Sequence, residues 1–148
     1  MAYQEQLVRV RRWLARIEPK QGDFGPQDDY ADFLRAFVVE DWHLVDWIAH
    51  DSSCSIGDGI WDIALNYDSL KVCRKLANQA KHSPINLIRP KLTGIDTTVI
   101  LGNPPKSKYG YRIGLTDGTE VDALDLVRQI VSDWEKVIKD HVVSPQKP

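Results

Sequence analysis

Cysteine is scarce in this sequence, and the little that is present builds no framework. The 148 residues include two cysteines, Cys54 and Cys73, which are too few for the disulfide network of a small secreted protein. Their spacing matches neither a CxxC pair nor a zinc-binding set. Each is expected to be a buried small hydrophobic side chain or a free thiol, which favours a reducing compartment.

Long hydrophobic runs and a strong excess of charge are also missing. No apolar stretch approaches the length of a membrane span, and the first residues lack the apolar core of a signal peptide. We therefore expect a cytoplasmic protein without a membrane partner. The net charge of -2 excludes a broad electrostatic footprint for nucleic acid, so any such binding depends on a local patch.

What is present is the composition of an ordinary globular domain. Hydrophobic residues make up 43% of the chain and charged residues 27%, which excludes wholesale disorder. We find no internal repeat. A single domain is expected over residues 1–143, followed by a loose tail over residues 144–148.

Four stretches have the apolar spacing of helices. The predicted helices cover residues 3–18, about 28–51, 69–82 and 122–141, and Asp68 and Asp122 are placed to cap the last two. The second helix has the widest apolar face, which is typical of the middle of a bundle. Residues 59–66 are ambiguous between a short helix and an irregular segment.

The pattern changes between the third and the fourth of these helices. Residues 97–101 are rich in β-branched side chains, residues 109–115 form a second strand-like stretch, and a tight-turn signal leads into residues 119–121. The sequence thus predicts a mainly α fold. Its expected architecture is a four-helix bundle with a small antiparallel β-meander at about residues 96–121, inserted before the last helix.

The predicted third helix ends in the most suggestive cluster of polar side chains. At about 100° per residue, Lys75, Asn78 and His82 share one face, and Arg74 and Lys81 lie on an adjacent one. A cation, an amide and an imidazole together are suited to holding phosphate, and the imidazole can exchange protons near neutral pH. The alternative is a solvated helix end, since the helix dipole favours Lys and His there in any protein.

Two segments resemble small bacterial HEPN-like proteins. The first runs from FLRAF to WHLVDWI over residues 33–48, and the second is CRKLANQAKH over residues 73–82. In those proteins a His-Leu-x-Asp-Trp helix is followed by a helix that ends in Leu-x-Asn-x-x-Lys-His. The resemblance covers about residues 30–84, and it implies a HEPN-like helical bundle that forms a homodimer through these two helices.

Many HEPN proteins are metal-independent ribonucleases of toxin–antitoxin or phage-defence systems. The resemblance therefore implies binding of RNA or a nucleotide, an antitoxin partner and endoribonuclease activity without a metal or other cofactor. The family motif places four to six residues between an Arg and a His. In this chain seven residues separate Arg74 from His82, and six separate Lys75 from His82.

In the nuclease interpretation, His82 is the general base or acid for attack of a 2′-hydroxyl on the adjacent phosphate. Asn78 orients the phosphate or the imidazole. The developing charge is stabilised by a neighbouring cation: Arg74, Lys75 or Lys81.

The predicted second helix offers two further interpretations. His43, Asp46 and His50 are spaced three and four apart, so they share a face that could ligate a metal together with a fourth group. No zincin-type Glu accompanies them, and ordinary hydrogen bonding accounts for each, so we assign no metal-binding residue. Alternatively, His43 and Asp46 support Asn78 or His82 across the helix pair, which the HEPN-like resemblance favours.

Two other patches bear on nucleic acid. Residues 106–111 mix lysine with tyrosine, which suits either base stacking or an ordinary hairpin surface. The four arginines within residues 9–16 are either a phosphate-facing patch or ion-pair partners. For the chain as a whole, the alternative to a nuclease is a non-enzymatic interaction or scaffold protein whose tryptophan-rich helices form a dimer interface. It predicts an exposed apolar patch, with Asn78 and His82 buried and fully hydrogen-bonded.

Overall fold

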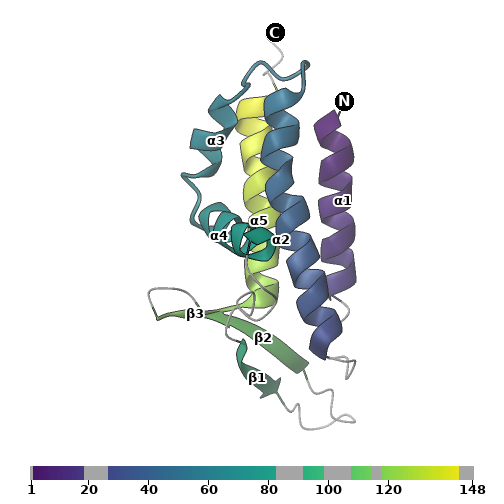
Figure 1. The fold of residues 1–148 in the computed structure, drawn as a ribbon, viewed down its shortest axis with the longest axis vertical. Coiled ribbons are helices and arrows are strands. Elements are labelled where there is room, and N and C mark those ends of the chain that lie inside the picture. Colours follow the sequence, from purple (N-terminus) through teal and green to yellow (C-terminus); the bar gives the residue numbers. More distant parts are fainter. Residues whose placement is uncertain (1, 19–26, 83–91, 99–107, 115–117, 144–148) are drawn as a thin grey trace.

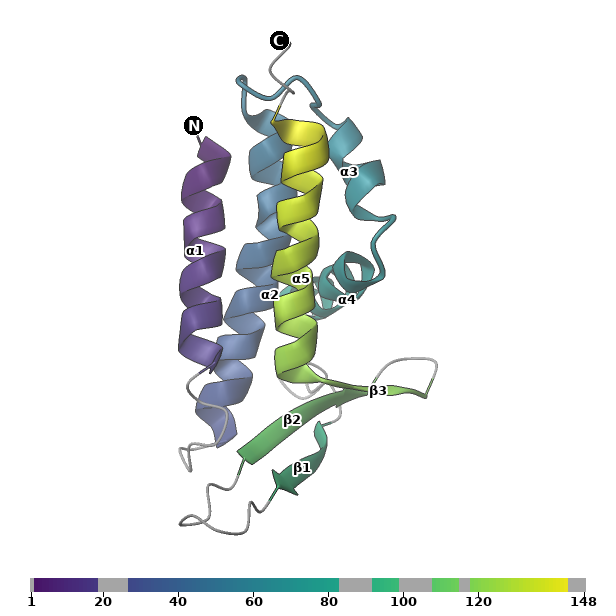
Figure 2. The same ribbon diagram turned by 180° about the vertical axis from the view of Figure 1, so that it is seen from behind.

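The computed structural model describes residues 2–18, 27–82, 92–98, 108–114 and 118–143, and within them the fold is mainly α-helical (Figures 1 and 2). Its helices are α1 (Ala2–Ile17), α2 (Gln27–His50), α3 (Gly59–Ala64), α4 (Asp68–His82) and α5 (Ala123–Val137). A π-helical turn, η3 (Ile138–Val142), continues α5. The strands are β1 (Leu92–Thr98), β2 (Lys108–Gly114) and β3 (Glu120–Asp122).

The helix boundaries follow the apolar spacing closely. Each of the four predicted helices is confirmed to within about one residue when η3 is counted with α5, and the ambiguous residues 59–66 contain the short helix α3. The predicted cap of the third helix is wrong by one position. Asp68 is itself the first residue of α4, and the backbone N–H of Lys71 donates to the carbonyl oxygen of Tyr67 at 3.0 Å.

Three of the long helices are aligned and the fourth crosses them. α1, α2 and α5 lie side by side along the long axis of the molecule, with α1 antiparallel to α2, whereas α4 runs across α2 and α5 (Figures 1 and 2). α2 packs against α1, α3 and α4, which explains why its apolar face is so wide. Among the described residues, none of the helices combines the length and apolar character needed to cross a bilayer.

The strands form an antiparallel sheet in the order β1-β2-β3, at the end of the molecule where α5 begins (Figure 1). β2 and β3 lie within one residue of the predicted stretches, but β1 begins at Leu92, five residues before the predicted first strand. Gly94 and Asp96 give this segment a low strand propensity, so its pairing with β2 is not visible locally. Residues 99–107, which include the predicted loop and most of that first strand, lie outside the described residues, as does the tail over residues 144–148.

The core lies where α1, α2, α4 and α5 meet. Its fully buried side chains include Val10 and Ile17 of α1, Phe37, Leu44, Val45 and Ile48 of α2, Leu70, Cys73 and Ala77 of α4, and Val127, Ile130, Trp134 and Val137 of α5. Burial of each larger aliphatic or aromatic side chain contributes about 1.5–3 kcal/mol. The position of α4 is therefore fixed mainly by the apolar side that it turns toward α2 and α5.

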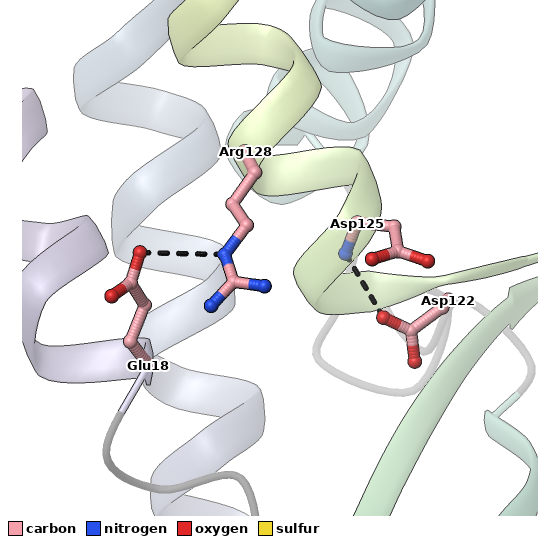
Figure 3. Close-up of polar contacts among 4 residues, drawn as sticks. All are labelled: Glu18, Asp122, Asp125 and Arg128. Carbon is pink, nitrogen blue, oxygen red and sulfur yellow. Dashed lines mark hydrogen bonds and ion pairs between the residues drawn. The ribbon is translucent and has the colours of Figure 1, made fainter.

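Polar contacts fix the ends of α5. The Asp122 carboxylate accepts a hydrogen bond from the backbone N–H of Asp125 at 2.9 Å, which confirms Asp122 as the cap of this helix (Figure 3). Two ion pairs join α5 to α1 and to the residue that follows α1: Arg11 to Glu135 at 3.0 Å, and Arg128 to Glu18 at 3.5 Å (Figure 3). Both pairs are about half exposed, so each contributes at most about 1 kcal/mol.

Candidate functional site

α4 turns one side to the core and the other to solvent. Cys73 and Ala77 are completely buried, whereas Arg74, Lys75 and Asn78 are exposed. The two cations and the amide therefore point away from the buried side of α4. Because residues three and four apart on a helix are neighbours, both cations lie next to Asn78.

Arg74, Lys75 and Asn78 form no polar side-chain contact with another element in the described part of the chain. Within it, no hydrogen bond or ion pair involves the side chain of Arg74, Lys75 or Asn78. Lys81 and His82 are the last two residues of α4, three and four positions after Asn78. The placement of the Lys81 and His82 side chains lies outside the described residues, so their predicted roles stay predictions.

His43 and Asp46 are not brought to this side of α4. The side of α2 that faces α4 is marked by Asp41, which contacts Cys73, and His43 lies about 200° around the helix from Asp41. Asp46 lines a hollow of about 280 Å³ beside the start of α1, together with Ala2, Trp47 and His50. The support that we expected from His43 and Asp46 across the helix pair is therefore absent from this geometry.

The metal-site interpretation of α2 also finds no geometric support. The His50 ring Nδ1 lies 2.9 Å from the backbone carbonyl oxygen of Asp46, within its own helix. Over the described ranges, no three side chains of His, Cys, Asp or Glu gather closely enough to hold a metal ion. A shared helix face with spacings of three and four is therefore insufficient here, because the side chains do not converge.

A buried polar cluster that the sequence analysis missed lies beneath α4. Asp41 of α2 is completely buried, and its Oδ2 accepts hydrogen bonds from Trp134 Nε1 of α5 at 2.8 Å and from Cys73 Sγ of α4 at 3.3 Å. Cys73 Sγ also lies 3.6 Å from the carbonyl oxygen of Val38. Asp41 Oδ1 is buried, and none of the described residues donates a hydrogen bond to it. One carboxyl group thus joins the three helices that cross at this point.

The surroundings of this cluster favour neutral side chains. Burial raises the pKa of Asp41 from 3.8 to about 7, against the hydrogen bonds from Trp134 and Cys73, which lower it. Burial, together with the nearby Asp41 carboxylate, raises the pKa of the Cys73 thiol well above its usual value. A nucleophilic cysteine needs accessible thiolate, so Cys73 has the character of a structural thiol and not of a catalytic one.

A second buried contact holds the beginning of α4 on α5. Ser69 Oγ donates to Asp133 Oδ2 at 2.6 Å, and Gln129 Nε2 donates to Asp133 Oδ1 at 2.9 Å. Lys136 lies 3.5 Å from the same carboxylate. With Asp41, this contact anchors the buried side of α4 at two points, so the exposed side is presented on a fixed helix.

One sequence signal could have revealed Asp41. The apolar stripe of α2 includes Leu34, Val38, Val45 and Ile48 at helical spacing, and Asp41 occupies the position in the middle of that stripe. A carboxylate there must be buried, paired or neutral. The apolar members of the stripe predict the helix and its buried side, and the acidic residue among them indicates a buried carboxyl group.

The exposed surface bears on the scaffold alternative. Among the described residues, the large hydrophobic side chains that are exposed are Val8 of α1 and Val143, which directly follows η3. The tryptophans that this alternative assigns to an interface are buried or half-buried: Trp13, Trp42, Trp47, Trp61 and Trp134. The described surface therefore lacks the apolar patch that a tryptophan-rich interface predicts, and Asn78 is exposed rather than buried.

No model of a known protein family, no curated protein and no solved structure matches this chain. Function is therefore inferred from the exposed side of α4 and from the buried contacts that fix it. Two exposed cations next to an amide, on a helix held by polar and apolar packing, form a surface suited to a phosphate group.

Proposed function

We propose that this chain is a HEPN-like protein that binds RNA through the exposed side of α4 and cleaves it without a metal ion. The observation that carries the proposal is the exposure of Arg74, Lys75 and Asn78 on one side of a helix whose other side is anchored in the core. Their side chains have no competing partner in the described part of the chain. A phosphate bound there would therefore compete with none of the described residues for these side chains.

Each of these side chains suits a different part of phosphate recognition. The Arg74 guanidinium can donate two parallel hydrogen bonds to phosphate oxygens, and the Lys75 ammonium adds a mobile point charge. The Asn78 amide can donate to a phosphate oxygen or accept from a neighbouring hydroxyl or imidazole. The same set would also stabilise the extra negative charge that develops during phosphoryl transfer.

His82 supplies the proton transfer in this proposal. As general base it takes the proton of a 2′-hydroxyl, whose oxygen attacks the adjacent phosphorus. The bond to the 5′-oxygen breaks, and that oxygen leaves with a proton from an acid, which leaves a 2′,3′-cyclic phosphate and a 5′-hydroxyl. In a homodimer the second copy of His82 is available as that acid.

The homodimer and the bundle are part of the same proposal. The resemblance to HEPN-like proteins covers α2 and α4. In the described residues α2 packs against α1, α3 and α4, so the exposed side of α4 is the surface of these two helices that is available to a second copy. The dimer contact and the RNA site would then share this side of α4. An antitoxin that covers α4 would block both, in keeping with a toxin–antitoxin or phage-defence setting.

Cleavage of a labelled RNA pool in the presence of EDTA tests the proposal. The wild-type chain is compared with His82→Ala and with His141→Ala, a matched control at an exposed histidine at the end of η3. We expect cleavage by the wild type and the control, and loss of cleavage in folded His82→Ala. Equal cleavage by folded His82→Ala would remove His82 from the mechanism, and no cleavage by any of the three would reject the nuclease.

A further inference from the structure

α1 carries a second group of cations, on the opposite side of α2 from α4 (Figures 1 and 2). Arg9, Arg12 and Arg16 are spaced three and four apart, so they fall within about 60° of one another around the helix. All three are exposed. Along the axis they span about 10.5 Å, which is the rise of seven helical residues.

The structure separates these three arginines from the fourth arginine of the helix. Arg11 forms an ion pair with Glu135 of α5, so its charge is already compensated. Arg12 and Arg16 form no ion pair with any described residue, and Arg9 donates only to the Gln6 side chain, at 3.2 Å. Arg11 is therefore an ion-pair partner, whereas Arg9, Arg12 and Arg16 form an exposed stripe of cations that has no ion pair with a described residue.

Two members of the stripe are held in place by indole rings. The Arg9 guanidinium lies 5.4 Å from the ring centre of Trp47 on α2, and that of Arg16 lies 4.6 Å from the ring centre of Trp13. Trp13 in turn packs against Phe33 of α2, with ring centres 5.8 Å apart. Stacking restrains a guanidinium while its N–H groups stay free at the edge, which lowers the entropic cost of binding an anion.

We propose that the α1 arginine stripe, Arg9, Arg12 and Arg16, binds the phosphate backbone of single-stranded RNA. Three exposed cations without an ion pair among the described residues are a local feature of a chain whose net charge is -2. Guanidinium groups matched to phosphate, next to half-buried tryptophans, are the elements of sequence-independent single-strand binding. The inference rests on the proposed function in taking RNA as the ligand, but it concerns a different surface.

The test is a titration of a fluorescent single-stranded RNA at several salt concentrations. Arg12→Ala/Arg16→Ala is compared with Arg11→Ala/Arg128→Ala, which removes the same charge from the two ion pairs of α5. We expect the first variant to bind RNA on the order of tenfold more weakly. The slope of log K against log salt concentration should become less steep by about 0.7 for each phosphate contact that is lost. The control variant should keep most of the affinity.

A lysine variant and an α4 variant complete the test. Arg12→Lys/Arg16→Lys keeps the charge, and partial or full recovery of binding supports the stripe; no recovery in a folded protein contradicts it. Unchanged affinity of Arg12→Ala/Arg16→Ala, together with loss of binding in Arg74→Ala/Lys75→Ala, overturns the inference and leaves the α4 site standing. The reverse pattern rejects the α4 site and supports the stripe. A wild-type chain that does not bind RNA contradicts both.

Discussion

Asp41 has a carboxyl group that is buried among α2, α4 and α5, with one oxygen that accepts two hydrogen bonds and one that accepts none from the described residues. Its pKa is raised to about 7. An ionised carboxylate at this position is costly, because burial removes its solvation and the two donors compensate only in part. The junction of the three helices is therefore coupled to pH.

The sign of this coupling follows from the two pKa values. Below 3.8 the group is protonated in both the folded and the unfolded chain. Between 3.8 and about 7 the unfolded chain loses the proton while the folded chain keeps it, so the free energy of unfolding falls as the pH rises. Above about 7 the cost is constant, and the pKa difference corresponds to on the order of 4 kcal/mol at most.

Asp41→Asn is expected to remove this pH dependence. The amide oxygen can still accept from Trp134 and Cys73, and no charge forms at any pH. Relative to wild type, the variant should gain stability as the pH rises from about 5 to about 8. Urea unfolding of both proteins at these two values measures the gain. A difference between the two proteins that does not change with pH would show that Asp41 is not the titrating group.

The two cysteines give a second prediction at this scale. Burial raises the pKa of both thiols, and Cys73 also faces the Asp41 carboxyl group. Because only the thiolate reacts, both should react slowly with a disulfide reagent in the native protein near neutral pH, and rapidly after unfolding in denaturant. Rapid reaction of one thiol per chain in the native protein would contradict this. The Cys54→Ser and Cys73→Ser variants would then identify the reactive thiol.

Among the secondary-structure elements, α5 shows how a single contact defines a helix end. The strand β3 runs directly into α5, and the Asp122 carboxylate accepts the N–H of Asp125 at that transition (Figure 3). Asp122→Ala should lower the free energy of unfolding by about 1 kcal/mol, as measured by urea titration. Asp32→Ala, at an exposed position on α2, is the control and should have little effect. An equal change in the free energy of unfolding in the two variants would show that Asp122 does not stabilise α5 as a cap.

The elements also show which features local sequence can predict. The helices have long apolar periodicities, and Asp122 has the position of a cap, so their boundaries follow from residue spacing. β1 has no such signal, because Gly94 and Asp96 interrupt it and its pairing with β2 depends on residues far along the chain. The exposed face of α4 was predictable for the same reason as its core face, since both follow from one helical period.

For the molecule as a whole, the arrangement of helices decides what each face can do. α1, α2 and α5 form an aligned layer, and α4 crosses it with one side anchored at Cys73 and Ser69 and the other open to solvent. The crossing of α4 was not predictable from periodicity, which defines a buried face but not the direction of the helix that packs on it. For that reason the sequence places His43 and Asp46 on a helix, but it does not show which side of α4 they face.

Contact between RNA and the exposed side of α4 is tested most directly by an NMR titration. Backbone amide signals of the isotopically labelled chain are followed as a short single-stranded RNA is added. The largest shifts are expected in α4 from Arg74 to His82, with a second group at Arg9, Arg12 and Arg16 of α1 and little change in α3. Shifts confined to other elements, or no shifts at concentrations where the RNA is in excess, would contradict it.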